Sequence, residues 1–182
     1  MTSIRIWGPG AGAVLVLVAA GVWARGSSAV DAGLWADVRP AIEARLVTQS
    51  AGNGAGESEP DLRSRWFCRA EALDLEESAN RVRAGINTLC EEYGVRAGAL
   101  VMCGGAAIPQ VVRLERDTAN GGYRVVSQEE QPDGDSSDWD DSHFSHYAES
   151  RIGQGMEAES AGLQTLARTH FGLPPTAPVR NC

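Results

Sequence analysis

The feature that most constrains this fold is a series of alternating apolar and polar stretches between residues 65 and 126, joined by short turns. The clearest stretch presents one face made of Val82, Ala84, Ile86, Thr88 and Cys90. Such alternation is typical of β-strands, because successive side chains of a strand point to opposite faces of a sheet. Connections this short cannot make the crossover that parallel strands need, so the sequence predicts an antiparallel β-meander.

The third strand of this series is interrupted by small residues and a proline. Gly104-Gly105 and Pro109 follow the apolar run 99–103, and strand-like spacing resumes at residues 110–116. We expect a bulge or a bend at this point rather than the end of a strand. Asn120-Gly121 then predicts a tight hairpin, because both residues tolerate positive φ, and it leads into residues 123–126.

Helical spacing flanks the strands on both sides. Asp31 can cap an N-terminal helix whose apolar stripe is Leu34, Trp35, Val38, Ile42 and Leu46. Pro40 falls inside this stripe and predicts a kink or two short helices. Two further stripes follow the strands: Phe144, Tyr147, Ala148 and Ile152, and then Met156, Leu163, Leu166, Ala167 and Phe171.

These patterns predict an α+β fold. A curved antiparallel meander of four to five strands packs against N-terminal and C-terminal helices, which we expect to cover one face of the sheet. The expected organisation is a targeting segment at 1–29, a helix and Gly-rich linker at 30–60, the α+β domain at 61–176 and a tail at 177–182.

Two short motifs resemble those of a known group of proteins. Trp66-Phe67-Cys68-Arg69-Ala70-Glu71 and Leu89-Cys90-Glu91-Glu92-Tyr93 are similar to segments of uncharacterised exported bacterial proteins. Pro109-Gln-Val-Val112 and Tyr123-Arg-Val-Val126 extend the likeness, which covers roughly residues 66–152. The resemblance implies a cystatin-like or nuclear-transport-factor-2-like curved sheet, and it implies no catalytic residue.

Residues 1–29 have the pattern of a signal peptide. Arg5 gives the positive start, residues 13–22 form an apolar run, and Ser27-Ser28-Ala29 offers small residues at a cleavage position. The run is shorter than the roughly 20 residues of a membrane-spanning helix, which favours cleavage over a retained anchor. The sequence therefore predicts an exported protein, secreted or held in the cell envelope, that meets a membrane only through an uncleaved N-terminus.

Four cysteines predict disulfide bonds in such an oxidising compartment. Cys68 and Cys90 lie on consecutive predicted strands, which favours a Cys68–Cys90 bridge and leaves Cys103–Cys182 to tie down the tail. Cys90–Cys103 across the next hairpin is the competing pair. A zinc site or a redox motif would need closer spacing than these cysteines have.

The charge of the chain excludes some partners. All 16 basic residues are arginine, and 24 acidic residues give a net charge of −8. An acidic surface is not expected to bind nucleic acid, because that affinity comes largely from cations that neutralise phosphates. Without lysine, neither a Walker-type phosphate loop nor a Schiff base can form.

Two groups of polar residues are candidate metal ligands. Asp133, Asp135 and Asp138 alternate in an acidic stretch and offer the oxygen atoms that Ca²⁺ prefers, although the spacing does not fit an EF-hand. His143 and His146 lie one helical turn apart after these aspartates and could bind Zn²⁺. The alternative for both groups is a solvated polar surface.

No catalytic or cofactor-binding residue is predicted. Gln110-Val111-Val112 resembles part of the cystatin inhibitory loop, but Leu114 stands where that loop has glycine, and the segment has the pattern of a strand. Two functions remain open. One is a non-catalytic module that binds a protein or a small extracellular ligand. The other is an isomerase-like or dehydratase-like enzyme with a small-molecule pocket in the concave sheet.

Overall fold

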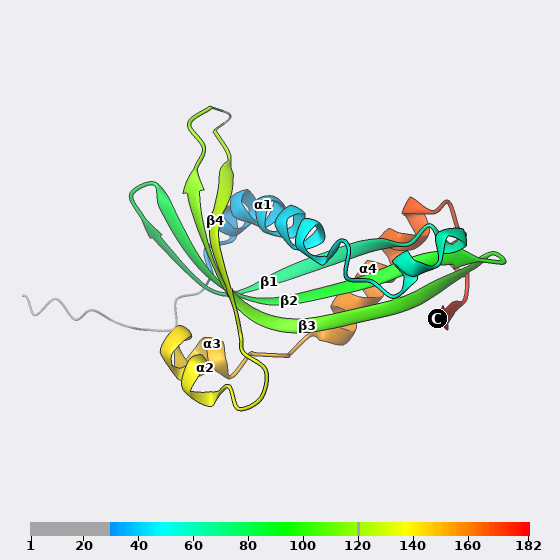
Figure 1. The fold of residues 1–182 in the computed structure, drawn as a ribbon. Coiled ribbons are helices and arrows are strands. Elements are labelled where there is room, and N and C mark those ends of the chain that lie inside the picture. The colour runs from blue at the N-terminus through cyan, green and yellow to red at the C-terminus, as the bar shows by residue number, and fades with distance from the viewer. Residues whose placement is uncertain (1–29, 120) are drawn as a thin grey trace, which may run out of the picture.

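The strands form one continuous antiparallel meander, as the sequence predicts (Figure 1). The computed structural model describes residues 30–119 and 121–182. Within these residues, β1 (Arg65–Ser78), β2 (Arg81–Arg96), β3 (Ala99–Arg116) and β4 (Tyr123–Glu130) pair in that order. The targeting segment at 1–29 and Asn120 of the predicted hairpin lie outside the described residues.

β3 is long and continuous, and its irregularities are bulges. The register with β2 shifts between the pairs Glu92↔Gly104 and Tyr93↔Met102, so Cys103 is an extra residue on β3. The predicted interruption is therefore a bulge within an unbroken strand. A bulge increases local twist and bends the strand, in keeping with the strong curvature of the sheet in Figure 1.

A fifth strand replaces part of the predicted tail. β5 (Val179–Asn181) pairs in parallel with β3 at residues 100–102. Three residues are too few to show a strand period in the sequence. The position of β5 depends on tertiary contacts, which include the bond between Cys182 and Cys103.

α1 (Ala32–Ser50) fills the bend of the sheet, and its start follows the predicted cap. The Asp31 carboxylate accepts a hydrogen bond from the Leu34 N–H at 2.8 Å. The helix continues through Pro40, so the alternative of two short helices is wrong. Pro40 lies on the exposed side, while Val38, Ile42 and Leu46 are buried against the sheet on either side of it. This packing places residues from both halves of the helix against the sheet.

The remaining helices cover the opposite face of the sheet, so the expectation that all helices share one face is wrong. α2 (Ser137–His143) and α3 (His146–Glu149) pack with Leu73 and Val111, and α4 (Met156–His170) packs with Leu89 and Tyr93. The α1 face instead receives the even-numbered side chains of β2 from Val82 to Ile86. Most of β2 is buried on both faces because each face meets a helical layer.

The linker after α1 is short and partly buried. It contains two 3₁₀ turns, η1 (Gly56–Ser58) and η2 (Pro60–Leu62), and Leu62 is 1% exposed. Both disulfides have the pairing that the sequence favours: Cys68–Cys90 joins β1 to β2, and Cys103–Cys182 joins β3 to the end of β5. Among the described residues, no helix combines the length and apolar character needed to span a membrane.

Candidate binding site at the open edge of β3

The outer edge of β3 has a gap between two neighbouring strands. β5 covers residues 100–102, and β4 covers residues 110–116. In the part of the chain that the structure describes, the residues between these two segments pair with β2 alone. We call Cys103–Ile108 the open edge.

The open edge presents backbone N–H and C=O groups that pair with no strand among residues 30–119 and 121–182. The carbonyl oxygen of Pro109 faces outward, because it accepts from the Gln131 N–H at 3.0 Å. Backbone groups alternate between the two edges of an antiparallel strand, so the N–H and C=O of Ala107 and Gly105 face outward as well. At the other end of the gap, the Cys182 N–H donates to the Met102 carbonyl at 2.9 Å.

Small side chains leave a groove beside this edge, on the α4 face of the sheet. The groove has a volume of about 560 Å³, and Gly105, Ala106 and Ala107 are exposed along it. Its other lining residues are Leu89, Glu91, Met102, Cys103, Gly104, Asn181 and Cys182. The sequence signal for this groove is the run of glycine and alanine at residues 104–107, although Gly104-Gly105 and Pro109 by themselves predict only a bulge or a bend.

Glu91 is the ionisable residue that lines the groove, and its charge has no cationic partner among the described residues. Its carboxylate accepts hydrogen bonds from the Tyr93 hydroxyl at 2.7 Å and from the Ser160 hydroxyl at 2.8 Å. The residue is 7% exposed. Burial, together with the bond to Glu91, raises the pKa of Tyr93 well above its usual range, so the phenol stays a donor to the carboxylate.

Glu92 points to the opposite face, as expected for neighbours on a strand. Its carboxylate accepts from the Gly56 N–H at 2.9 Å and from the Ser64 hydroxyl at 2.6 Å, and the residue is 0% exposed. These contacts fix the linker against the sheet. Glu92 therefore has a structural role, and the two glutamates do not form a catalytic pair.

The predicted calcium ligands do not converge. Asp135 accepts hydrogen bonds from the Ser137 hydroxyl and backbone N–H, and these bonds lower the pKa of Asp135. Asp133 and Asp138 do not join it in a group of three possible ligands within residues 30–119 and 121–182. The interactions of Asp135 are those of a turn ahead of α2.

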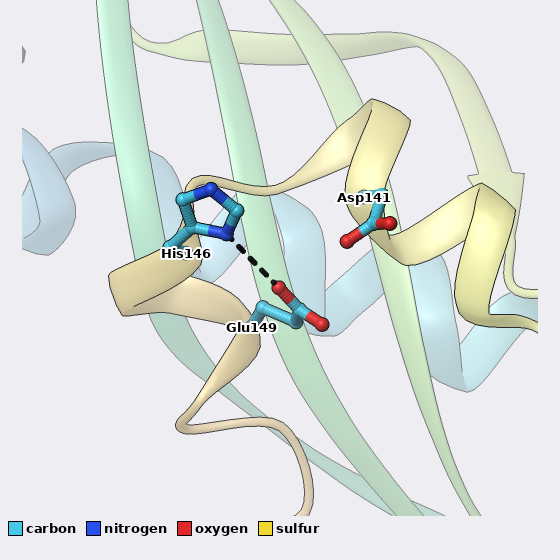
Figure 2. A group of neighbouring side chains, drawn as sticks. All are labelled: Asp141, His146 and Glu149. Atoms are coloured by element: carbon cyan, nitrogen blue, oxygen red, sulfur yellow. Dashed lines mark ion pairs between the residues drawn. The ribbon is translucent and has the colours of Figure 1, made fainter.

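The two predicted zinc ligands lie in different surroundings. His143 stacks on Trp139 with ring centroids 4.3 Å apart, and its Nε2 lies 3.1 Å from the Glu129 carboxylate. His146 instead joins Asp141 and Glu149, with donor atoms within 4.8 Å of one another (Figure 2). The predicted helix that would have aligned the histidines is broken between α2 and α3.

The Asp141–His146–Glu149 group carries the donor atoms of a divalent-cation site but lacks a supporting structure. The His146 side chain is 99% exposed, and its Nδ1 lies 3.5 Å from the Glu149 carboxylate, the ion pair drawn in Figure 2. Built cation sites hold their ligands in place through surrounding contacts. The geometry here is that of an exposed ion pair beside an aspartate.

Ser142, His143 and Glu129 also lie close together, but their hydrogen bonds do not suit nucleophilic catalysis. The His143 Nδ1 lies 2.7 Å from the Trp139 carbonyl oxygen and 2.9 Å from the Ser142 hydroxyl, and that hydroxyl lies 2.9 Å from the same carbonyl oxygen. A carbonyl oxygen can only accept, so the His143 Nδ1 carries its proton toward Trp139 and has no lone pair free to act as a base toward Ser142. The group anchors the end of α2.

Two other features bear on function. Gln110-Val111-Val112 lies buried within β3 and does not form an exposed inhibitory loop. The bend of the sheet, where an enzyme of the alternative class would hold its substrate, is packed with α1 side chains and the apolar face of β2. The groove beside the open edge is the site whose geometry suits a ligand.

Comparison with protein-family models, curated proteins and solved structures found no match to the chain. Function is therefore inferred from the geometry of the site.

Proposed function

We propose that this protein is an exported, non-catalytic binding module that engages a partner protein through the open edge of β3. The observation that carries the proposal is the gap between β4 and β5, which leaves outward backbone groups beside a groove. Natural sheets usually protect such edges, because an uncovered strand pairs readily with another chain. An edge that stays open beside a shallow groove suits recognition.

The proposal includes a cystatin-like architecture and an extracytoplasmic location. The helix α1 in the bend of an antiparallel meander supports the first. Two disulfides, an acidic surface and the signal-like N-terminus support the second. The packed bend of the sheet favours this function over a small-molecule enzyme.

A capture experiment with a blocked edge tests the proposed function. The wild-type protein and the Ala107→Pro variant are used to capture partners from the extracellular medium and envelope fraction of the producing cells. The Ala107 N–H faces outward, so proline there removes a donor from the open edge without removing a bond to β2. Ala107→Ser, which keeps the N–H, is the matched control.

We expect a partner that binds the wild type and Ala107→Ser but not Ala107→Pro, with equal melting temperatures for the three proteins. Capture of the same partner by all three would reject the open edge as the binding site.

A further inference from the structure

We infer that the ligand of the open edge is an extended peptide segment that adds a strand to β3 and places an arginine or lysine side chain over Gly105 toward Glu91. This inference rests on the proposed function and specifies the chemistry of its partner.

The backbone of the open edge sets the length and conformation of the ligand. About six residues at roughly 3.3 Å each give a gap near 20 Å long. A peptide in this gap can exchange hydrogen bonds with the outward N–H and C=O groups of Gly105 and Ala107. Strand addition of this kind supplies affinity through the backbone and specificity through side-chain pockets.

A short free-standing segment fits the gap better than a second copy of this chain. β4 and β5 occupy the same edge on either side of the open edge. The long β3 of another copy would run into one of these strands after a few residues. A peptide that leaves the sheet plane at both ends avoids this conflict.

The register across the sheet brings one peptide side chain into reach of Glu91. Gly105 is paired directly with Glu91, and an ideal Cβ on Gly105 would lie 3.2 Å from the Glu91 Cγ. A peptide residue opposite Gly105 lies two strand spacings from Glu91, or roughly 10 Å. Because Gly105 has no side chain, a long side chain can cross this distance along the groove.

The charge of the groove favours a cation at that position. Glu91 is more than nine-tenths buried, and the other side chains that line the groove are uncharged. Arg5 and Arg25 lie in the first 29 residues, which leaves 14 arginines against 24 acidic residues in the rest of the chain. A buried carboxylate gains from a charge-assisted hydrogen bond, and a guanidinium can donate two at once.

Peptide selection tests the inference. Random nonapeptides displayed on phage are selected against the purified, disulfide-bonded protein and, in parallel, against Ala107→Pro. We expect enrichment on the wild type alone, with an arginine or lysine at one fixed position between β-branched residues at alternate positions.

An enriched peptide is then titrated by fluorescence anisotropy. We expect Ala107→Pro to weaken binding at least tenfold and Ala107→Ser less than twofold. Replacing the peptide arginine with citrulline, which leaves the protein unchanged, should weaken binding about fivefold. The same replacement should have no effect on the Glu91→Gln variant, because the cation then has no carboxylate to meet.

Three results would overturn the inference. The first is equal enrichment on the wild type and Ala107→Pro, or no enrichment on either. The second is equal affinity for the arginine and citrulline peptides. The third is self-association of the wild type that Ala107→Pro abolishes, which would assign the edge to a second copy. If the capture experiment still gives an edge-dependent partner, the binding function stands and only the peptide chemistry is wrong.

Discussion

At the scale of single residues, two buried carboxylates are stabilised by hydrogen-bond donors instead of cations. Glu91 depends on Tyr93 and Ser160, and Glu92 depends on Gly56 and Ser64. A buried charge without such donors would cost several kcal/mol. The donors therefore contribute to local stability at both positions.

We predict that Tyr93 makes the protein sensitive to alkaline pH. The pKa of this phenol is raised in the folded state by burial and by Glu91, from a usual value of 10.0. Its contribution to stability is fully present below that value. It is lost as pH rises further, because the unfolded chain then releases the proton and the folded chain holds it.

Urea denaturation between pH 8 and pH 11 measures this effect. Tyr93→Phe should flatten the alkaline loss of unfolding free energy and cost about 1–3 kcal/mol at pH 8, where a donor to the buried carboxylate is missing. An unchanged alkaline slope in Tyr93→Phe would contradict the prediction.

We also predict that Gly54 is needed for the position of Glu92. An ideal Cβ on Gly54 would lie 2.4 Å from the Glu92 carboxyl carbon, so alanine must displace that carboxylate from its donors. We expect Gly54→Ala to lower the unfolding free energy by about 1–3 kcal/mol. Gly104→Ala is the control, because its Cβ would meet the same carboxylate at an ordinary 4.0 Å. Equal unfolding free energies for the two variants would count against this role of Gly54.

At the scale of elements, the sequence predicts what depends on local pattern. The strands of the meander, the capped α1 and the amphipathic α4 each carry a period or a cap, and the structure confirms them. β5 has no such signal, because its three residues are ordered by β3 and a disulfide. The burial of β2 on both faces is not evident from the sequence pattern. Leu89 and Tyr93 are isolated apolar residues among polar ones on their face, so the pattern does not predict that α4 covers them.

The candidate site was harder to predict than the fold for a physical reason. An open edge is the absence of a neighbouring strand, which depends on where β4 leaves the sheet and where β5 joins it. The predicted metal candidates are exposed polar residues whose grouping depends on the break between α2 and α3. Neither the open edge nor the grouping of these polar residues can be predicted from local sequence patterns.

Adjacent positions of α4 provide a test of its packing. An added Cβ at Gly162 meets nothing within 4 Å, whereas Leu163 is 0% exposed. We expect Gly162→Ala to stabilise the protein by about 0.5–1 kcal/mol, because alanine favours the helix. Leu163→Ala should destabilise it by about 2–5 kcal/mol through the cavity that it leaves. Thermal unfolding followed by circular dichroism measures both, and destabilisation by both variants would show that Gly162 has a packing role.

At the scale of the whole molecule, the two disulfides close loops of different length. Cys68–Cys90 spans 22 residues within the β1–β2 hairpin, and Cys103–Cys182 spans 79 residues between β3 and β5. The chain-entropy treatment gives about 3.4 kcal/mol for the shorter loop and about 4.5 kcal/mol for the longer. The longer loop also contains β4, α2, α3 and α4.

We predict that replacing both Cys103 and Cys182 with serine releases β5 but leaves the α1 core folded. The unfolding free energy should fall by about 2–4 kcal/mol. Hydrogen exchange should accelerate at residues 100–102, where β5 pairs, and stay slow in the β1–β2 hairpin. Unchanged exchange at residues 100–102 would mean that β5 is held without the disulfide. Non-reducing peptide mapping of the protein purified from its producing cells checks both pairings and tests whether residues 1–29 are removed.

The unequal sequence separations of the two disulfides affect the order in which they can form. In a chain that crosses a membrane from its N-terminal end, Cys68 and Cys90 emerge early. Cys103 can pair with Cys182 only after a further 79 residues have emerged. During this wait Cys103 is a free thiol on the strand next to Cys90, whose register partner is Ala106. In such a chain, early formation of Cys68–Cys90 prevents a wrong bond between Cys90 and Cys103. The order of synthesis therefore favours the observed pairing.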